Sequence, residues 1–523
     1  MTLQSLMQGR AQVTDQQAGF SGGANQIGDA LEVQPNQMPR ADNVRLTTIG
    51  GATKRGGTQR MHTTALGSGN PIRAGFCWRK ASSVEHLAVA NGTLYSGGSS
   101  IALPMTYTAK AMSGGGAALS STNYLSIVHF RDGTGECLYI ADGASTLAKW
   151  DGTTLSRVAS TPSGITRLAV YNQRLFGITG TDQTVWWSAV NNGDTIGISG
   201  SAGGSAVVRT FGNQKLTTLA TIVATLAMSH VTGVSRFTGI TQDDIAIAAG
   251  AQGFSSDVGS QFPNSWVVAD GVGYFLSDRG AYQVLDAGIS ALDTPVTPDP
   301  TVPLITALAS SDFGQVSGVH DPVHHEIRWY IPGLGIAVFN YRLRAWSTYP
   351  SGIYVDEPTT VQWGAVDDNG DPIVLFGSTD GFVRRADAPV MRVDDVLADG
   401  TAGSSFSMVA QCHRMFSQDD VSEKSYRNAF VFADLDNSTS CSLSWQSPST
   451  GQGVQTIQPI SSGPVWGSFT WGSFAWGGNG ATRYKVPISG RGPYIDLTIT
   501  DDSDRAPIIS RITLQAFDMG PRA

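Results

Sequence analysis

The hydrophobic positions of this chain fall in short runs, and each run is followed by a turn that contains glycine, asparagine or aspartate. From about residue 71 the pattern repeats loosely as an apolar strand, a turn, an aromatic-containing strand, a second turn and a third strand. Such units occur at His86–Gly98, Cys137–Val158, Arg167–Val190, Ser265–Asp286, Glu326–Pro350 and Trp363–Asp387. Their spacing of roughly 25 to 60 residues brackets the roughly 40 to 50 residues of a β-propeller blade.

A unit of three or four short strands cannot bury both faces of its own sheet. Radial stacking of such units buries these faces and leaves only short edges, as in a propeller. We therefore predict a β-propeller over residues 71–390. It has about six blades if the less regular stretch from Thr210 to Phe262 contains one and the units around residues 71–103 and 363–387 are counted flexibly. Five or seven blades, and tandem β-sandwiches, are alternatives that the pattern leaves open.

The segments on either side differ from the repeats. Residues 1–70 predict an extended N-terminal arm, since Pro35 and Pro39 exclude helix, with a hairpin around Gly50 and Gly51. The arm has few large apolar residues, so it should pack onto the main body or onto a neighbour. Residues 391–523 predict a linker and then, from Ser405, a C-terminal β-sandwich, because polar and apolar residues alternate there over several positions.

Composition supports an all-β fold and limits the range of partners. The chain has 62 glycines and 23 prolines but only 7 lysines and 6 glutamates, which leaves little material for helix surfaces. Its net charge is −8, its pI is about 5.5, and no stretch concentrates lysine and arginine, so tight binding to nucleic acid is disfavoured. An acidic surface would suit a channel through which DNA slides without sticking.

The rest of the sequence indicates no metal site, no disulfide and no membrane-spanning segment. Cysteines 77, 137, 412 and 441 form no CxxC pair, so we expect reduced, buried thiols. The N-terminus lacks the layout of a secretory signal. The longest apolar stretch, Leu216 to Met228, is interrupted by threonines and is too short to span a bilayer.

Three segments resemble the propeller-containing tail hub, DNA-stabilisation or tubular tail (nozzle) proteins of short-tailed bacteriophages. The first is the arm, with ADNVRL (residues 41–46) followed by GGATKRGG (residues 50–57). The second is DVGSQFPNSWVVADGVGYFLSDRGAYQV, from Asp257 to Val284. The third is ISGRGPYIDLTITDDSDRAPIISRITLQAF, from Ile488 to Phe517. Together they cover the start, middle and end of the chain in that family's order.

This resemblance implies a structural virion protein and not an enzyme. It implies a homo-oligomeric ring, commonly a hexamer, that continues the portal's DNA channel, retains packaged DNA and takes part in genome ejection. The implied partners are portal or adaptor proteins and tail fibres or a spike. DNA would pass through without specific binding, and there would be no direct membrane insertion. The protein would be made in the host cytoplasm and reside in the phage tail.

At each place where the sequence suggests a chemical site, a turn explains the residues better. Ser277–Gly280 and Ser378–Gly381 only approach the Ser-x-Asp-x-Gly-x-x-Trp box of propeller glycosidases, and Asp-Gly turns explain them. The histidine cluster of His320, His324 and His325 beside Glu326 fits a polar turn before a strand. Asp367–Pro372 fits a hairpin turn better than a calcium loop. We predict no catalytic residue, cofactor or metal.

A rival hypothesis from another class is a receptor- or carbohydrate-binding tail protein. The repeat WGSFTWGSFAWGG, from Trp466 to Gly478, predicts an exposed loop or hairpin. Its Trp466, Trp471 and Trp476 could form a platform on which sugars stack, or could pack against the next subunit.

Overall fold

The computed structural model confirms that the chain is all-β, with strands throughout and only short helical turns such as Leu66–Ser68, Gly193–Thr195 and Pro263–Ser265. It describes residues 12–25, 33–81, 83–133, 135–198, 203–239, 253–255, 257–285, 288–292, 307–309, 314–350, 359–388, 393–400, 403–416, 421–435, 440–458, 482–503 and 507–521. Among these residues, no helix is long and apolar enough to cross a membrane.

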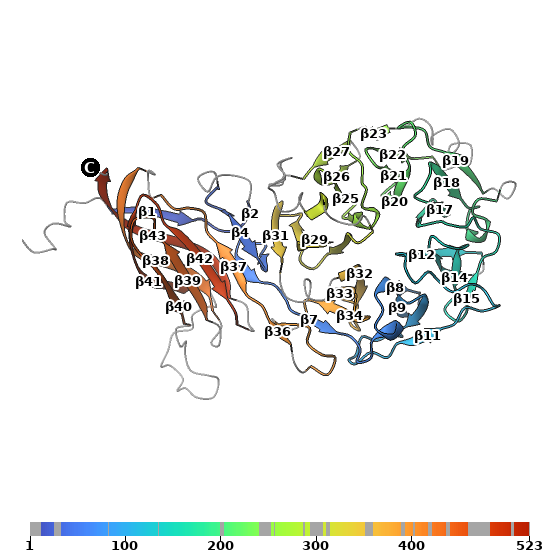
Figure 1. Cartoon of the computed structure of the whole chain (residues 1–523), viewed down its shortest axis with the longest axis horizontal. Coiled ribbons are helices and arrows are strands. Elements are labelled where there is room, and N and C mark those ends of the chain that lie inside the picture. The colour runs from blue at the N-terminus through green and yellow to red at the C-terminus, as the bar shows by residue number, and fades with distance from the viewer. Residues whose placement is uncertain are drawn as a thin grey trace, which may run out of the picture.

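Seven antiparallel four-stranded units follow one another along the described residues (Figure 1). Six of them are separate sheets, and the sixth in order, β28–β31, is part of a nine-stranded sheet. The units are called sheets below. The first four sheets are β8 (Ile72–Arg79), β9 (Val84–Ala90), β10 (Thr93–Ser96) and β11 (Thr108–Lys110); β12 (Ser126–Asp132), β13 (Gly135–Ala141), β14 (Ala148–Trp150) and β15 (Leu155–Arg157); β16 (Arg167–Tyr171), β17 (Arg174–Ile178), β18 (Thr184–Trp187) and β19 (Gly204–Val207); β20 (Leu216–Ile222), β21 (Thr225–His230), β22 (Val234–Phe237) and β23 (Gly253–Ser255). The other three are β24 (Val267–Ala269), β25 (Val272–Ser277), β26 (Gly280–Leu285) and β27 (Gly288–Ala291); β28 (Ser317–Asp321), β29 (Glu326–Ile331), β30 (Gly335–Asn340) and β31 (Ala345–Tyr349); β32 (Thr359–Val366), β33 (Pro372–Ser378), β34 (Val383–Ala386) and β7 (Thr58–Arg60).

The seven sheets form a closed ring. The first strand of each sheet lies against the first strand of the next, and β32 of the seventh sheet returns to β8 of the first. A separate apolar core fills each interface between consecutive sheets: Trp78 and Trp150 lie between the first and second sheets, and Trp329 and Phe339 lie between the fifth and sixth. Face-to-face burial of this kind is what units with two apolar faces require.

The ring has one sheet more than the predicted count of about six blades. The stretch from Thr210 to Phe262 does contain a sheet, β20–β23, in addition to the six repeat units found in the sequence. Its first turn, Val223–Ala224, carries no glycine, asparagine or aspartate, although Val223 takes a left-handed φ of 49°. A turn built by a β-branched residue gives no turn signal in the sequence, so this unit is less regular there than the others. The count fell one short because the units around residues 71–103 and 363–387 were counted flexibly, whereas each of them is a full four-stranded sheet.

The last sheet of the ring is completed by a strand from the other end of the sequence. β7 pairs with β34 through Arg60 opposite Arg384, Gln59 opposite Arg385 and Thr58 opposite Ala386. Residues that precede the ring in the chain therefore close it.

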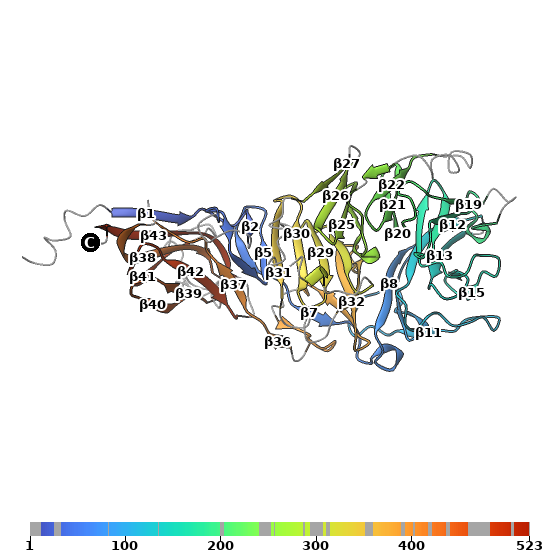
Figure 2. The same cartoon turned by 45° about the horizontal axis from the view of Figure 1, so that its top comes forward.

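Beyond the ring, two sheets pack face to face around one apolar core (Figure 2). One has the order β41-β38-β43-β6-β5, with β1 also paired to β43, and the other runs β4-β37-β42-β39-β40. Their strands are β1 (Gln12–Gln17), β4 (Arg40–Asp42), β5 (Val44–Leu46), β6 (Ala52–Lys54), β37 (Met408–Gln411), β38 (Ser422–Asp434), β39 (Cys441–Gln446), β40 (Gln452–Ile457), β41 (Thr482–Gly492), β42 (Asp496–Asp501) and β43 (Ile508–Pro521). Two short pairs, β2 (Gly23–Ala24) with β3 (Gln37–Met38) and β35 (Val393–Asp394) with β36 (Ser404–Ser405), lie between the modules.

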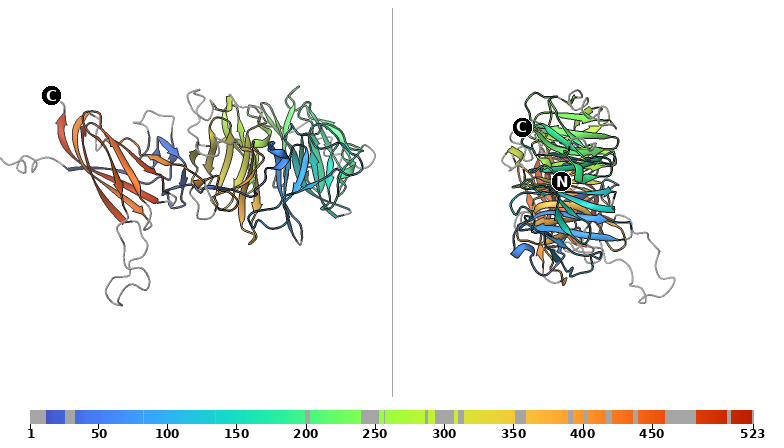
Figure 3. Two further views of the ribbon diagram at one scale, coloured as in Figure 1. Left: turned by 60° about the horizontal axis from the view of Figure 1, so that its bottom comes forward. Right: turned by 90° about the vertical axis from the view of Figure 1, so that its right-hand side faces the viewer.

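Strand β4 joins the two modules into one continuous sheet. Asp42 pairs with Thr348 of β31 in the ring on one side and with Val409 of β37 on the other. The ring and the C-terminal sheets thus lie end to end along the long axis of the molecule (Figure 3). The N-terminal segment packs onto the main body, since its described strands pair with strands of both modules, and β5 and β6 form a hairpin at Gly50 and Gly51.

Candidate functional site

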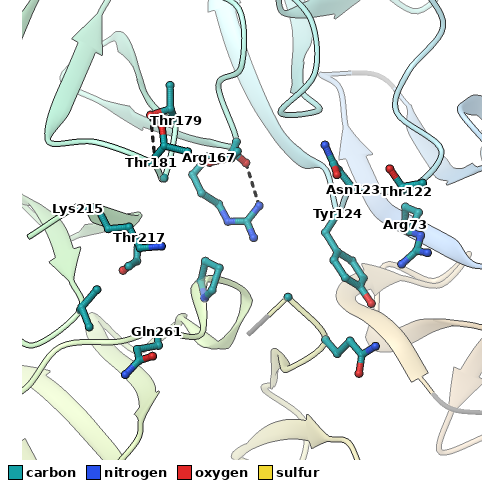
Figure 4. Close-up of a pocket in the computed structure, with 16 residues that line it drawn as sticks. Arg73, Thr122, Asn123, Tyr124, Arg167, Thr179, Thr181, Lys215, Thr217 and Gln261 are labelled. Atoms are coloured by element: carbon teal, nitrogen blue, oxygen red, sulfur yellow. Dashed lines mark hydrogen bonds between the residues drawn. The ribbon is translucent and has the colours of Figure 1, made fainter. Parts of the chain in front are cut away.

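A cavity of about 590 Å³ lies at one mouth of the ring (Figure 4). Its walls come from the residues at which the first strands of successive sheets begin, such as Arg73 at β8, Tyr124 before β12, Arg167 at β16 and Lys215 before β20. Because the first strands run side by side around the ring, their starts converge on the same face. Ring closure therefore brings together residues that are far apart in the sequence.

The cavity is cationic although the chain is acidic. Arg73, Arg167 and Lys215 line it, and no aspartate or glutamate does so among the described lining residues. The rest of the described lining is mainly neutral and polar: Thr122, Asn123, Thr166, Thr179, Thr181, Thr217, Gln261 and Gln315.

Arg167 is the most constrained of the three cations. Its Nη1 donates to the carbonyl oxygen of Thr166 at 2.9 Å, while its buried Nε has no hydrogen-bond partner in the described part of the chain. Burial lowers the pKa of Arg167 to about 10, so the guanidinium remains protonated at neutral pH. Figure 4 shows this side chain pointing into the cavity, with Tyr124 and Arg73 on the opposite wall. A desolvated cation with an unused donor is suited to bind an anion.

Arg73 connects this cavity to a second one. Its guanidinium carbon lies 5.1 Å from the centre of the Tyr124 ring, and its buried Nε also lacks a hydrogen-bond partner among the described residues. The second cavity, of about 420 Å³, shares the wall formed by Arg73, Tyr124 and Gln315. We call the two cavities together the mouth cavity.

The lining of the mouth cavity combines cationic side chains, which can bind an anion, with neutral polar side chains around them. Arginines supply fork-shaped donors for a carboxylate or phosphate, and threonine hydroxyls both donate and accept. The described lining has no pair of carboxylates such as most glycoside hydrolases use for acid–base chemistry.

Sequence reasoning missed these three cations. Arg73 and Arg167 each occupy the first or second position of the first strand of a repeat, and Lys215 directly precedes one. Basic residues that recur at the start of a first strand were a possible signal of the cavity. They can be recognised as such only when the start of each strand is known.

A second cluster of charges lies where the N-terminal segment meets the ring, and we call it the clamp. Arg45 of β5 binds Asp387 at 2.6 Å and Glu326 at 3.3 Å, and Arg328 of β29 binds Asp387 at 2.6 Å. Arg328 also pairs with Asp321 and with Glu326. Burial acts to raise the pKa of Asp387, but the facing Arg328 and Arg45 outweigh it and hold that pKa well below its ordinary range.

Two further arginines of the N-terminal segment bind the stretch that follows the ring. Arg55 donates to Asp394 at 2.8 Å and lies 3.7 Å over the ring of Phe406, and Arg60 donates to Asp395 at 2.8 Å. A Cβ on Gly57 would come within 1.9 Å of the Val393 carbonyl oxygen, so this close approach requires glycine. The basic residues of the ADNVRL and GGATKRGG motifs thus hold the chain together internally.

The structure places the histidine cluster at the edge of the clamp. His324 Nδ1 lies 2.8 Å from Asp321 Oδ2, and together with Asp387 these groups come close enough to hold a metal ion. Both carboxylates are already paired with Arg328. His320 and His325 instead contact the hydroxyl of Tyr341, at 3.2 and 3.3 Å.

Added Zn²⁺ is expected to leave the melting temperature of the protein unchanged. The carboxylates near His324 are neutralised by arginines, and a cation there would meet the positive charge of Arg328 and Arg45. Differential scanning calorimetry with and without Zn²⁺ measures this. A rise in melting temperature that His324→Ala abolishes would contradict it.

The other sequence candidates lie in turns or outside the described residues. Asp367 Oδ1 accepts from the backbone of Asn369 at 2.9 Å and of Asp371 at 3.0 Å in the turn between β32 and β33. Ser277–Gly280 forms the turn between β25 and β26. Asp380, within Ser378–Gly381, pairs with Arg384. Residues Trp466, Trp471 and Trp476 lie outside the described part of the chain.

His62 links the N-terminal segment to the seventh sheet in its neutral form. The Val383 N–H donates to Nε2 at 2.9 Å, and Nδ1 lies 2.7 Å from the Thr64 carbonyl oxygen. Burial lowers the pKa of His62 to about 4. Since the unfolded chain takes up this proton near the ordinary value of 6.5, the stabilisation from neutral His62 is present above that pH and is lost as the pH falls toward 4.

His62→Gln is therefore expected to weaken the loss of stability between pH 6.5 and 4, because glutamine can replace both hydrogen bonds without titrating. Urea unfolding at several pH values measures the slope. His129→Gln, at an exposed position of β12, is the matched control and should leave the slope unchanged. Equal slopes for His62→Gln and the unmodified protein would disprove this role.

Comparisons with known proteins add little. No family model matches the sequence, and no curated protein matches it. Two similar solved structures are extracellular domains from B. thetaiotaomicron. One, described as part of a one component system, has a TM-score of 0.33 and 15% identity over 51% of this chain and 32% of that chain. The other, described as part of a hybrid two component system, has a TM-score of 0.34 and 12% identity over 50% of this chain and 32% of that chain. Likenesses this low identify neither a fold nor a function.

Proposed function

We propose that the ring of seven sheets is a β-propeller and that the chain is a structural subunit of a short-tailed phage tail, a hub or nozzle protein. Several such subunits would form a homo-oligomeric ring around the DNA channel, contact portal or adaptor proteins, and hold fibres or a spike. The protein would reside in the virion and would retain the packaged DNA until ejection.

One observation carries this proposal: the N-terminal segment joins both modules into one stiff body. β4 makes a continuous nine-stranded sheet from the ring to the C-terminal sheets, and β7 closes the ring. In the clamp, ion pairs from Arg45 connect the same segment to Glu326 of the sixth sheet and to Asp387, which follows β34 of the seventh. A relative motion of the modules would break hydrogen bonds between strands and expose paired charges. The modules therefore keep a fixed arrangement, which suits a structural subunit of a ring.

The sequence supports the proposal at the same places. The motifs that resemble the tail proteins supply Arg45, Arg55 and Gly57, and each of these makes an internal contact between N-terminal and later strands. Stiff β modules also present constant side surfaces, as a symmetric ring requires of its repeated contacts.

Ring assembly tests the proposed function. The purified chain should form a closed ring, alone or on the portal and adaptor proteins of its own virus, in electron micrographs of single particles. Antibodies against the chain should label the tail of intact virions. Monomers that neither assemble with these proteins nor occur in virions would refute it.

A receptor- or carbohydrate-binding role is the second candidate, and the mouth cavity favours it. The tryptophans considered in the sequence lie outside the described residues, whereas the mouth cavity offers polar, cationic walls of ligand size.

A further inference from the structure

We propose that the mouth cavity binds an acidic saccharide, a sugar that carries a carboxylate, between Arg167 and Arg73. This binding site is independent of the tail-ring function. It needs only the closed ring of sheets, and its test gives a result whether or not the chain assembles.

The charge of the mouth cavity selects an anion. Arg167 and Arg73 each have a buried Nε without a hydrogen-bond partner among the described residues, and no described lining residue is acidic. Arg328 and Arg384, by contrast, are buried and paired with carboxylates. Two arginines left without a described ion-pair partner at one mouth thus mark a place where the negative charge comes from a ligand.

The neutral lining selects a ligand rich in hydroxyl groups. Five threonines and the side-chain amides of Asn123, Gln261 and Gln315 line the larger cavity. Hydroxyls and amides both donate and accept, so they complement sugar hydroxyls, which do the same. Tyr124 and Pro263 add apolar surface on which the C–H face of a sugar ring can lie.

The arrangement favours a sugar acid over inorganic phosphate. Phosphate would engage the arginines and leave the hydroxyl and amide walls without a partner. A sugar acid uses both kinds of wall at once, with the carboxylate at the arginines and the ring hydroxyls at the threonines.

The size of the cavity admits more than one sugar unit. The two cavities have volumes of about 590 and 420 Å³ and share the wall of Arg73, Tyr124 and Gln315. Each lies within the range of roughly 300 to 1,000 Å³ typical of small-molecule sites. We therefore expect an acidic oligosaccharide to bind more tightly than its monosaccharide, with one unit on each side of Arg73.

Isothermal titration calorimetry tests this with glucuronate, galacturonate and N-acetylneuraminate as probes. Glucose and galactose are the neutral controls, and inorganic phosphate is the control for charge alone. At least one acidic sugar should bind about tenfold more tightly than the neutral sugars, since a bidentate arginine–carboxylate pair is worth about that much. It should also bind more tightly than phosphate, which leaves the threonine and amide walls without a partner. Equal binding of acidic and neutral sugars, no binding of any acidic probe, or phosphate binding as tightly as the best acidic sugar would overturn the proposal.

Variants locate the site. Arg167→Gln and Arg73→Gln should each weaken binding of the best acidic probe by about tenfold or more, with an unchanged melting temperature as the check on folding. Arg79→Gln is the matched control, because Arg79 is an exposed arginine at the other end of the same strand as Arg73. Should Arg167→Gln fold less well, the milder Gln261→Ala and Gln315→Ala supply the readout. Binding that none of the cavity variants changes would place the site elsewhere and contradict the inference.

Discussion

Replacing Arg328 with methionine is expected to lower the free energy of unfolding by about 3 to 5 kcal/mol. Arg328 is buried and pairs with three carboxylates, Asp321, Glu326 and Asp387. Methionine fills similar space but leaves Arg45 as the sole arginine of the clamp. Removal of one partner from a buried network leaves uncompensated charge, which costs more than the pair itself contributes.

The matched control is Arg40→Met. Arg40 also pairs with an aspartate, Asp42, but its side chain is 57% exposed, so the change should cost at most about 1 kcal/mol. Urea unfolding monitored by tryptophan fluorescence measures both variants. An Arg328→Met protein as stable as Arg40→Met would show that the clamp is not a source of stability.

The same variant should change the dependence of stability on pH. The pKa of Asp387 is depressed in the folded protein, so its contribution is present above the ordinary carboxyl range and is lost as the pH falls. Without Arg328 the pKa of Asp387 lies closer to its ordinary value, so the loss of stability on acidification should be smaller and should end at a higher pH.

Deletion of residues 1–60 is expected to abolish cooperative folding of the ring as well as of the C-terminal sheets. The deletion removes β7, so the seventh sheet keeps only β32, β33 and β34, and it removes β4 between the modules. It also removes Arg45, Arg55 and Arg60, which leaves Asp394 and Asp395 short of partners. We expect an aggregated product or a broad thermal transition in calorimetry.

A circular permutant is the matched control for this deletion. Gln12 of β1 pairs with Phe517 of β43, so the two ends of the described chain lie side by side. A chain that begins at Asn70, runs to residue 523 and continues through residues 1–69 retains every strand pair and breaks the chain only in an exposed segment before β8. It should fold with a single transition, and a folded deletion variant would contradict the closing role of β7.

The count of sheets shows where sequence patterns fail. Six units carry a strand–turn–aromatic pattern, because glycine, asparagine and aspartate mark turns that need a left-handed or tight backbone. The unit from β20 to β23 turns at Val223–Ala224, where no glycine, asparagine or aspartate marks the turn. The pairing of β7 with β34 spans more than 300 residues of sequence, and local patterns carry no information on such pairs.

In both sites, some residues were visible in the sequence, but their partners were shown only by the structure. Arg55 was visible as a basic residue between two glycine pairs and Arg45 as part of ADNVRL, but their carboxylate partners lie far away in the chain, at Asp394 and Asp387. Arg73 and Arg167 were visible only as ordinary strand residues. They meet at one mouth because the first strands of different sheets start on the same face of the ring.

By itself the sequence determined that this protein is all-β and made of short strands, since that follows from local composition and from turn residues that act within a few positions. Only the tertiary structure decided the seventh sheet, the strand that closes the ring, the partners in the clamp and the cations of the mouth cavity. Each of these depends on contacts between distant segments, and such contacts form only when the whole chain buries its apolar faces together.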